Sequence, residues 1–369
     1  MKSGEKIRFA VYDIECENWN EFLGLGYYDG TIYKFFDKIK DFIEFTKSLD
    51  KVNIYAHNGG RYDTLFLLDY LMPYGKAKHY TISDIILIDS SIASFKLFGN
   101  TFLDSLKLMP GSLGKIAPFF NEKKLDMDYK NIKNENWKPY LKQDCVGLWN
   151  VLDKYFKYIH KNFDSAPGLT IASTAMKVYR KKFNQIKIWG GNYEDEIRLS
   201  YLGGRTEIFK FNGSAINCYD INSMYPYVMR NNVFPTGYGI KIDRKFISGF
   251  INILHSEKNG IISATVICPD MYIPILPIRY AGKMMFFVGR ITGVWTLSEI
   301  RYAISKGYKV ERINYIIYYN ESIPMFNKWV DYVYGKRVKS KNEGERYILK
   351  ILQTSLYGKF GQRHDKEKL

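Results

Sequence analysis

Apolar and polar positions alternate from Lys6 to Glu15, which predicts a β-strand near the start of the chain. Side chains of a strand alternate between its two faces, so the apolar positions share one face, and Asp13 and Glu15 end that face. The two carboxylates then lie roughly 7 Å apart, and they repel each other unless a cation lies between them. Taken alone, such a pair is also typical of a solvated strand end.

A second strand is predicted at Val52–Ala56, before the glycine-containing stretch His57–Asp63. The two glycines of that stretch allow a tight loop and the close approach of a ligand backbone. Asp63 opens an apolar helix, where an aspartate is also a common helix cap. Residues 85–108 predict a hairpin and a strand that lead into Ser105–Pro110.

A helix is predicted from Pro139 to about Ile159. Tyr140 and Asp144 are four positions apart, so they project from the same face of this helix. Asp144 can complete a metal site while the Tyr140 hydroxyl orients a water molecule. The alternative is a helix with one exposed tyrosine and one exposed acid.

The stretch Tyr219–Pro226 predicts a strand that ends at Asp220, a turn, and a helix after Pro226. An acid at the end of a strand can hold a divalent metal, and the backbone N–H groups that follow can bind phosphate oxygens. Tyr225 would form a flat floor beside them. A capped turn with a buried tyrosine is the alternative.

The segment from Gly260 to Asn320 is predicted to be rich in β-structure with one helix. One strand is expected at Ile261–Val266 and another at Tyr308–Tyr319. The helix is expected to begin within Gly293–Glu299 and to end near Lys306.

The last predicted helix carries two stripes at helical spacing. The polar stripe consists of Arg346, Lys350, Thr354 and Tyr357, and the apolar stripe consists of Leu349, Leu352 and Leu356. A polar stripe with two cations suits the oxygens of a triphosphate. An amphipathic helix with a solvated basic face is the alternative.

Length and charge narrow the class of protein. The 369 residues suggest two or three domains. The net charge of +16 favours a polyanionic partner such as nucleic acid over a merely basic soluble surface. The 31 tyrosines and 24 phenylalanines include rings that can stack on unpaired bases, although most of them must be core.

Four scattered cysteines without a C-x-x-C pair predict reduced, intracellular thiols. The charged first residues predict that there is no signal peptide. No run of about 18 apolar residues occurs, so we expect no membrane span.

Three weak motifs occur in one order within about 130 residues: D-x-E, N-x-x-x-Y-D and Y-x-x-x-D. This ordered set resembles the three exonuclease motifs of DnaQ-like 3′–5′ proofreading domains. The resemblance implies catalysis and metal binding by Asp13, Glu15, Asp63 and Asp144, with Tyr140 as a further catalytic residue. Two divalent ions held there would activate a water and stabilise the leaving 3′ oxygen. Oxygen ligands suggest Mg²⁺, and Mn²⁺ also fits. The single-stranded DNA would contact Asn58, Tyr62, Ser105 and Leu106.

Two stretches of the second half resemble motifs of family B DNA polymerases. The first contains Tyr201, Gly203 and Gly204 and resembles the Y-x-G-G/A motif that tracks the template strand, with Arg205 supplying charge. The second resembles motif A, D-x-x-S-L-Y-P, with methionine in place of leucine. It implies that Asp220 is a metal ligand and catalytic residue, Ser223 a nucleotide contact and Tyr225 the steric gate against a 2′-hydroxyl.

The end of the last predicted helix resembles motif B of the same family. The resemblance places Lys350 on the incoming phosphates and Tyr357 at the nascent base pair, with Arg346 also on the nucleotide. Lys339 is a second candidate phosphate ligand, with Arg337 as its rival. Thr354 and Gly358 would face the DNA, although the family usually has asparagine at the position of this threonine.

The resemblance predicts a mixed α/β (α+β) fold: a DnaQ/ribonuclease H-like exonuclease domain followed by a partial polymerase palm and fingers. The expected boundaries are 1–165 for the exonuclease, 166–240 for a linker and the first part of the palm, 241–325 for an insertion of the protein-primed type, and 326–369 for the fingers. Relatives use that insertion to contact terminal protein and duplex DNA, and scaffold packing is the equal alternative.

The implied function is that of a protein-primed family B DNA-directed DNA polymerase with 3′–5′ proofreading, which replicates viral or linear-plasmid DNA. The implied partners are primer–template DNA, a single-stranded 3′ end, deoxynucleoside triphosphates and a terminal protein primer. Family members continue with motif C, a second catalytic aspartate, and then a thumb. No D-T-D-like pair follows Tyr357, so we expect polymerisation to need a separate C-terminal part.

Two alternatives are a stand-alone 3′–5′ exonuclease and a catalytically degenerate DNA-binding scaffold for initiation. The expected location is the host cytoplasm, or the mitochondrion for a plasmid of a eukaryote.

Overall fold

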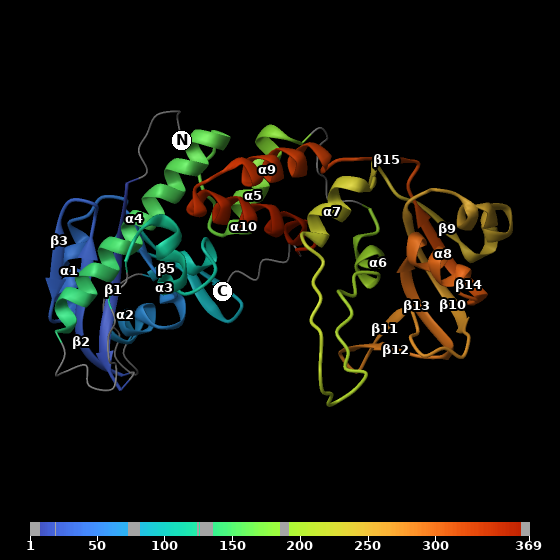
Figure 1. Cartoon of the computed structure of the whole chain (residues 1–369), viewed down its shortest axis with the longest axis horizontal. Helices are drawn as coiled ribbons and strands as arrows, with labels where there is room; N and C mark the ends of the chain where they lie inside the picture. Colours follow the sequence, from blue (N-terminus) through green and yellow to red (C-terminus); the bar gives the residue numbers. More distant parts are fainter. Residues whose placement is uncertain are drawn as a thin grey trace. The chain divides into compact units, whose positions relative to one another are not determined.

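A computed structural model describes residues 8–18, 20–72, 82–123, 125, 136–184 and 192–362 (Figure 1). The chain forms two compact units: Met1–Phe183 together with Asp331–Leu369, and Asn184–Val330. Residues 331–362 therefore belong to the same unit as the N-terminal part of the chain. The boundaries predicted at residues 165, 240 and 325 describe functional segments, and they stay predictions.

The first unit is built on a seven-stranded sheet in the order β3-β2-β1-β4-β7-β6-β5. β1 pairs in parallel with β4, and β4 pairs in parallel with β7, whereas the outer pairs are antiparallel. The strands are β1 (Phe9–Glu17), β2 (Glu21–Tyr28), β3 (Tyr33–Phe36), β4 (Asn53–Ala56), β5 (Ile82–Ile88), β6 (Ser91–Leu97) and β7 (Asn100–Asp104). The strand predicted from Lys6 to Glu15 is confirmed from Phe9 onward as β1, whereas Lys6 and Ile7 lie outside the described residues. The strand predicted at residues 52–56 is confirmed as β4.

Helices cover both faces of the central strands (Figure 1). The face of β1 that contains Tyr12 belongs to a core with α1 (Ile39–Lys47) and α2 (Asp63–Leu71). The opposite face, which begins with Phe9, packs against α4 (Trp137–Phe163). Because both faces are covered, Phe9, Ala10, Val11 and Tyr12 are all buried. The long helix predicted from Pro139 is confirmed as α4.

The remaining helices of the first unit follow the sheet or come from the C-terminal part of the chain. They are α3 (Leu113–Ile116), α5 (Ile171–Lys182), α9 (Asn327–Lys339), whose first turn is counted with the second unit, and α10 (Glu343–Phe360), with the short 3₁₀ helices η1 (Gly59–Arg61), η2 (Ser105–Lys107) and η3 (Ala117–Phe120). α10 packs against α5 and η3.

The two stripes predicted for the last helix are confirmed in α10. The apolar residues Leu349, Leu352 and Leu356 are fully buried. The polar residues Arg346, Lys350, Thr354 and Tyr357 are exposed. Packing of the apolar stripe therefore turns both cations to the outside.

The second unit contains an antiparallel four-stranded sheet in the order β13-β10-β14-β9. Its other elements include the two-stranded sheets β11–β12 and β15–β8. The bounds are β8 (Phe234–Thr236), β9 (Ile240–Asp243), β10 (Gly260–Cys268), β11 (Pro277–Tyr280), β12 (Lys283–Phe286), β13 (Gly289–Thr296), β14 (Lys309–Tyr318), β15 (Glu321–Ile323), α6 (Glu194–Leu199), α7 (Met224–Asn231), α8 (Leu297–Ser305) and η5 (Arg244–His255). The strands predicted at 261–266 and 308–319 are confirmed as β10 and β14.

The helix predicted to begin within Gly293–Glu299 and to end near Lys306 is confirmed as α8, which begins at Leu297, whereas the residues up to Thr296 belong to β13. Trp295 is buried in the sheet, and its Nε1–H donates to the carbonyl of Pro277 at 2.7 Å. Thr296 is the N-cap of α8: its hydroxyl accepts from the N–H of Glu299, whose carboxylate accepts from the N–H of Thr296. This reciprocal capping box marks the true start of the helix.

The predicted strand that ends at Asp220 is wrong. Residues 201–222 contain no helix or strand. Within the described residues, no strand pairs with this segment, and a lone extended segment gains no ladder hydrogen bonds. Phe211 is 96% exposed and Tyr219 is 88% exposed. The helix that follows, α7, begins at Met224 rather than after Pro226, because a proline is tolerated in the first turn of a helix.

Candidate active site

Three carboxylates gather where α4 crosses β1. Asp13, Glu15 and Asp144 each place one oxygen within 4.8 Å of the other two. Glu15 and Asp144 are buried, and Asp13 is half-buried. Carboxylates this close repel one another strongly when ionised, and a divalent cation among them removes the repulsion. The all-oxygen donor set fits Mg²⁺ or Mn²⁺.

Glycines on β2 allow α4 to come this close to the sheet. Gly26 and Gly24 pair with Asp13 and Glu15 across the β1–β2 ladder. A Cβ atom on Gly26 would lie 2.9 Å from Cys145 Sγ and 3.1 Å from Leu141 Cγ, both on α4. The absence of side chains at these positions of β2 therefore lets Asp144 reach the acids of β1.

A β-bulge completes this local geometry. The register of the β1–β2 ladder shifts between Glu15 and Cys16. Bulges re-aim side chains at the ends of strands and are over-represented next to active sites.

Substituting Gly26 tests this arrangement. We expect Gly26→Ala to destabilise the protein by about 1–3 kcal/mol, because the added methyl group overpacks the β2–α4 contact. We also expect weaker Mn²⁺ binding, since α4 must shift away from β1. Urea unfolding and a Mn²⁺ titration measure the two effects.

Gly147→Ala is the matched control for that substitution. Gly147 lies on α4, the helix that packs against Gly26, and nothing lies within 4 Å of a Cβ atom built on Gly147. Alanine should therefore leave stability unchanged or raise it by up to about 1 kcal/mol through helix propensity. Equal stability of the wild type and Gly26→Ala would contradict the packing argument.

The buried thiol of Cys145 stays outside the donor set. Burial and the negative charges of Asp13 and Asp144 raise the pKa of Cys145 well above its ordinary value. Its sulfur is not among the ligand atoms that lie within 4.8 Å of one another, so the candidate donors of this group are the three carboxylates.

Asp63 lies beside this group but is not one of the three carboxylates within 4.8 Å of one another. It is the first residue of α2 and is buried, and its Oδ1 accepts a hydrogen bond from the N–H of Ile14 at 2.9 Å. Burial raises the pKa of Asp63 to about 7, and the buried carboxylate of Asp104 contributes. A cation nearby would favour the ionised form. Its predicted role as a metal ligand stays a prediction.

Tyr140 and Asp144 are both buried on the same side of α4. The alternative of an exposed tyrosine and an exposed acid is therefore wrong. Tyr140 lies one helical turn before Asp144, as its predicted role beside the carboxylates requires.

The predicted DNA contacts Asn58, Tyr62, Ser105 and Leu106 follow the carboxyl ends of β4 and β7. These two strands run parallel to β1, so their ends lie at the sheet edge that carries Asp13 and Glu15. Asn58 is exposed in the left-handed conformation, and the Tyr62 hydroxyl contacts the thiol of Cys16.

Gly60, on the loop after β4, lies very close to the backbone of β6. A Cβ atom there would lie 1.9 Å from the carbonyl oxygen of Ile92 in β6. The close approach predicted for a ligand backbone is therefore, at this glycine, an approach to a neighbouring strand.

The polar residues around Ser105 form a network that the sequence patterns did not indicate. Ser105 is buried, and its hydroxyl donates to the carbonyl of Ala56 at 3.1 Å. His57 Nδ1 lies 3.0 Å from the Ser105 hydroxyl oxygen, and His57 Nε2 lies 2.8 Å from the carbonyl oxygen of Gly111. Asp104 Oδ1 accepts from the N–H of Leu106 at 2.9 Å, and burial raises the pKa of Asp104.

The residues predicted from the Y-x-G-G and motif A stretches lie in the second unit, and most of them are exposed. Asp220 is exposed, Tyr225 is 46% exposed, and Ser223 is left-handed with φ 55°. Tyr201, Gly203 and Gly204 are also exposed. Within the described residues, the one group of at least three metal-type ligands is that of Asp13, Glu15 and Asp144.

Arg205 was expected to supply free charge beside Tyr201, but it is engaged within the second unit. Its guanidinium donates to Glu207 Oε2 and to the carbonyl of Pro274, each at 2.6 Å. It also lies 3.9 Å from the ring centre of Phe286. This side chain therefore ties the segment after Gly204 to the β11–β12 hairpin.

The predicted nucleotide ligands of the first unit are accessible. Lys339, Arg346, Lys350 and Tyr357 are exposed on α9 and α10, whereas Arg337 is half-buried. Thr354 and Gly358 are exposed on the same face of α10 as Lys350.

Comparison with known proteins decides the family. The model of the family "DNA polymerase type B, organellar and viral" matches residues 46–138 and 134–369. The chain belongs to this family. The predicted membership of family B and the mixed α/β fold class are confirmed.

The relatives of this type B chain include viral and fungal proteins. A "Probable DNA polymerase" of Neurospora intermedia is 28% identical over 390 residues, which cover 88% of this chain and 40% of that protein. The DNA-directed DNA polymerase of Enterobacteria phage PRD1 is 27% identical over 399 residues, which cover 100% of this chain and 64% of that protein. The chain thus spans less than two thirds of the length of these relatives.

The fold is also that of a solved polymerase. An orthorhombic crystal form of Phi29 DNA polymerase superposes with a TM-score of 0.74 at 18% identity, covering 97% of this chain and 69% of that one. In this type B chain, the match to the family model includes the stretches around Asp144, Asp220 and Lys350, whereas Asp13 and Glu15 precede its first residue.

Proposed function

We propose that the chain is the 3′–5′ exonuclease and nucleotide-binding part of a protein-primed DNA-directed DNA polymerase that replicates viral or linear-plasmid DNA. The observation that carries the proposal is the group formed by Asp13, Glu15 and Asp144. Membership of the type B family and the names of the relatives support it. Among the described helices, none is long and apolar enough to cross a bilayer.

The exonuclease reaction is hydrolysis of the last phosphodiester bond of a DNA strand. Water attacks the phosphorus, the bond to the 3′ oxygen breaks, and that oxygen leaves as a new 3′-hydroxyl after it takes a proton. Asp13, Glu15 and Asp144, with Asp63 as the proposed fourth ligand, would hold Mg²⁺ or Mn²⁺. The bound ions would activate the water and stabilise the leaving oxygen.

The protein's own groups would position the reactants. Tyr140 is one turn from Asp144 and would orient the water by its hydroxyl. Asn58, Tyr62, Ser105 and Leu106 lie on loops at the same edge of the sheet and would hold the single-stranded 3′ end. Holding both reactants in place lowers the entropic part of the barrier.

The polymerase function rests on the exposed stripe of α10. Lys350 and Arg346, with Lys339 on α9, would bind the triphosphate of a deoxynucleotide, because cations stabilise phosphate oxygens in the transition state. Asp220, Ser223 and Tyr225 would complete the nucleotide site, with Tyr357, Thr354 and Gly358 at the nascent pair and Tyr201, Gly203 and Gly204 on the template. A primer 3′-hydroxyl, or a hydroxyl of a terminal protein at initiation, would attack the α-phosphate and release pyrophosphate.

Polymerisation needs a second carboxylate beside Asp220. We infer that it comes from a further polymerase segment that carries motif C and covers residues 201–222. Exposed apolar side chains support this inference, since Ile216 is 79% exposed and Ile221 is 70% exposed. Large apolar surfaces of this kind mark a site of association.

A stand-alone 3′–5′ exonuclease is the second candidate. It is favoured by the fact that, in the described part of the chain, the acids gather at β1 and α4 and not around Asp220. Either protein would act inside the cell that carries the phage or plasmid.

A labelled primer–template with Mg²⁺ tests the proposal. We expect the purified chain to shorten the primer with or without deoxynucleoside triphosphates, because Asp13, Glu15 and Asp144 form a group, whereas no group of at least three metal-type ligands among the described residues includes Asp220. Chelation of the metal should stop the shortening. Extension by this chain alone would contradict the inference about the second carboxylate. The lack of both activities would favour a DNA-binding scaffold.

A further inference from the structure

Residues 110–123 connect the C-terminal helix α10 with the carboxylate site, and all the contacts involved lie within the first unit. On the α10 side, the Tyr347 hydroxyl donates to the carbonyl oxygen of Pro110 at 2.6 Å. The Tyr347 ring lies 5.4 Å from the ring of Phe119 and 6.4 Å from that of Phe120, measured between centroids. A Cβ atom on Gly344 would lie 2.8 Å from Phe120, so α10 rests closely on this segment.

The next carbonyl group along the chain, that of Gly111, contacts the loop beside the carboxylates. The carbonyl oxygen of Gly111 lies 2.8 Å from His57 Nε2, and His57 Nδ1 lies 3.0 Å from the Ser105 hydroxyl. His57 begins the loop that holds Asn58 and Tyr62 and leads to Asp63. Two adjacent carbonyls thus accept hydrogen bonds from α10 and from the loop beside the carboxylates.

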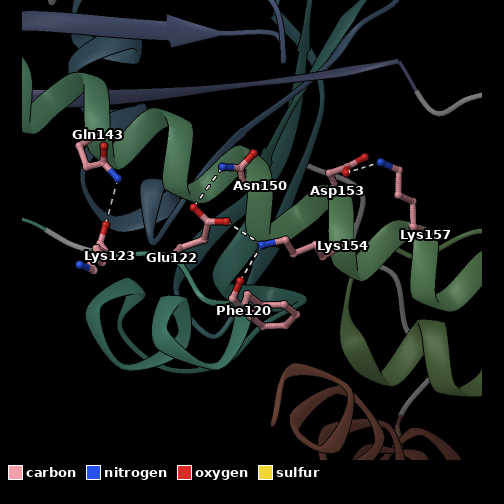
Figure 2. Close-up of polar contacts among 8 residues, drawn as sticks. All are labelled: Phe120, Glu122, Lys123, Gln143, Asn150, Asp153, Lys154 and Lys157. Carbon is pink, nitrogen blue, oxygen red and sulfur yellow. Dashed lines mark hydrogen bonds and ion pairs between the residues drawn. The ribbon is translucent and has the colours of Figure 1, made fainter. Parts of the chain in front are cut away.

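A second branch fixes the same segment to α4, as Figure 2 shows. Lys154 Nζ donates to the carbonyl of Phe120 at 2.6 Å and to the carboxylate of Glu122 at 2.7 Å. Asn150 donates to the other carboxylate oxygen of Glu122 at 3.1 Å. Gln143, the residue before Asp144, donates to the carbonyl of Lys123 at 3.1 Å. Phe120 therefore contacts Tyr347 with its ring and α4 with its backbone.

We propose that Tyr347 is a positioning residue for the exonuclease site: by holding Pro110 and Phe120 it sets where the His57 loop and the Asp144 segment of α4 stand relative to β1. This inference rests on the proposed exonuclease function. Tyr347 is suited to the task because it is a permanent neutral donor: burial raises the pKa of Tyr347 to about 12.

Tyr347 also connects this positioning role with the outer face of α10. Arg346 and Lys350 point outward from the helix turns that press Tyr347 and Gly344 onto η3. A deoxynucleoside triphosphate bound to the outer stripe would contact the same helix that holds Pro110 and Phe120 through Tyr347. Any coupling between nucleotide binding and the hydrolytic site must be reciprocal.

The test is a double-mutant cycle on the hydrolysis of a single-stranded oligonucleotide. Tyr347→Phe keeps the ring and removes the donor. His57→Asn keeps an amide nitrogen in the place of Nδ1, next to Ser105, and no longer reaches Gly111. We expect each substitution to slow hydrolysis about three- to tenfold, as for the loss of one neutral hydrogen bond. Both substitutions remove contacts in the same chain of contacts between α10 and the carboxylate site. The double variant should therefore hydrolyse DNA at about the rate of the slower of the two single variants.

Two controls separate positioning from general damage. Tyr334→Phe alters a tyrosine of α9 that is 47% exposed, and it should leave hydrolysis unchanged. Tyr347→Phe should keep the melting temperature of the wild type within a few degrees. Unchanged hydrolysis in Tyr347→Phe, or effects that multiply in the double variant, would overturn the proposal.

A Mn²⁺ titration of the same variants distinguishes failure of this proposal from failure of the proposed function. If the wild type does not hydrolyse DNA, the exonuclease function is wrong, and the positioning role is then judged by metal affinity. We expect Tyr347→Phe to bind Mn²⁺ about threefold more weakly, since the carboxylates of α4 and β1 lose their alignment. Equal Mn²⁺ affinity of the wild type and of Tyr347→Phe would overturn the positioning role.

Discussion

Asp13→Asn is expected to slow 3′–5′ degradation of DNA about a thousandfold. The amide has the shape of the carboxylate but no charge, so the group of three acids loses one of its metal ligands. Metal ions contribute several kcal/mol to such reactions, and about 4 kcal/mol corresponds to a factor of a thousand. Gel assays of a labelled oligonucleotide in Mg²⁺ measure the rate.

Stability and DNA binding should survive that substitution. Asp13 is half-buried at the end of a strand, and removing one of three like charges relieves repulsion. The matched control is Asp153→Asn, which alters an acid of α4 paired with Lys157 on the helix surface and should leave the rate unchanged. Hydrolysis by Asp13→Asn at the wild-type rate would show that the metal assignment is wrong.

Affinity for single-stranded DNA should fall steeply with salt. The chain carries 54 basic and 38 acidic residues, and neutralised phosphates release counterions when it binds. With about six phosphate contacts, the affinity should drop roughly 300-fold between 50 and 200 mM salt. Fluorescence anisotropy of a labelled oligonucleotide measures the slope.

Single lysines then report on the location of the contacts. Lys350→Gln should reduce the slope by about one phosphate contact if the α10 stripe binds the nucleic acid or nucleotide. Lys47→Gln should leave the slope unchanged, because Lys47 lies on α1, where it is paired with Glu44 at 2.6 Å. A flat response to salt in the wild type would contradict the basic binding surface.

Patterns of local periodicity predicted much of this molecule. The alternation that ends in Asp13 and Glu15 predicted the strand β1 correctly. The two acids lie together at one end of the strand because every second side chain of a strand lies on the same face. The four-residue spacing of Tyr140 and Asp144 predicted that the two residues share one face of α4, and the structure buries that face. The stripes of α10 followed from the helical period alone, and the structure buries the apolar stripe.

Contacts between distant parts of the chain could not be predicted in this way. The approach of α4 to Gly26 depends on tertiary packing, although the repeated glycines of the stretch Glu21–Tyr28 were an available signal. The hydrogen bonds of His57 to Ser105 and Gly111 join residues 48 and 54 positions apart, which no local pattern encodes. The strand expected to end at Asp220 failed because a strand needs a partner as well as a pattern.

The first unit is interrupted in the sequence, and this affects the order in which the protein can fold during synthesis. Residues 184–330 form a unit that is continuous in the chain, whereas α10 must return to segments made more than 200 residues earlier, as from Tyr347 to Pro110. A ribosome therefore releases α5 and η3 long before α10, which packs against both of them. Until α10 emerges, the apolar surfaces that receive Leu349 and Leu352 stay open to chaperones and proteases. Helix α10 thus completes the unit that begins with the N-terminal strands of the chain.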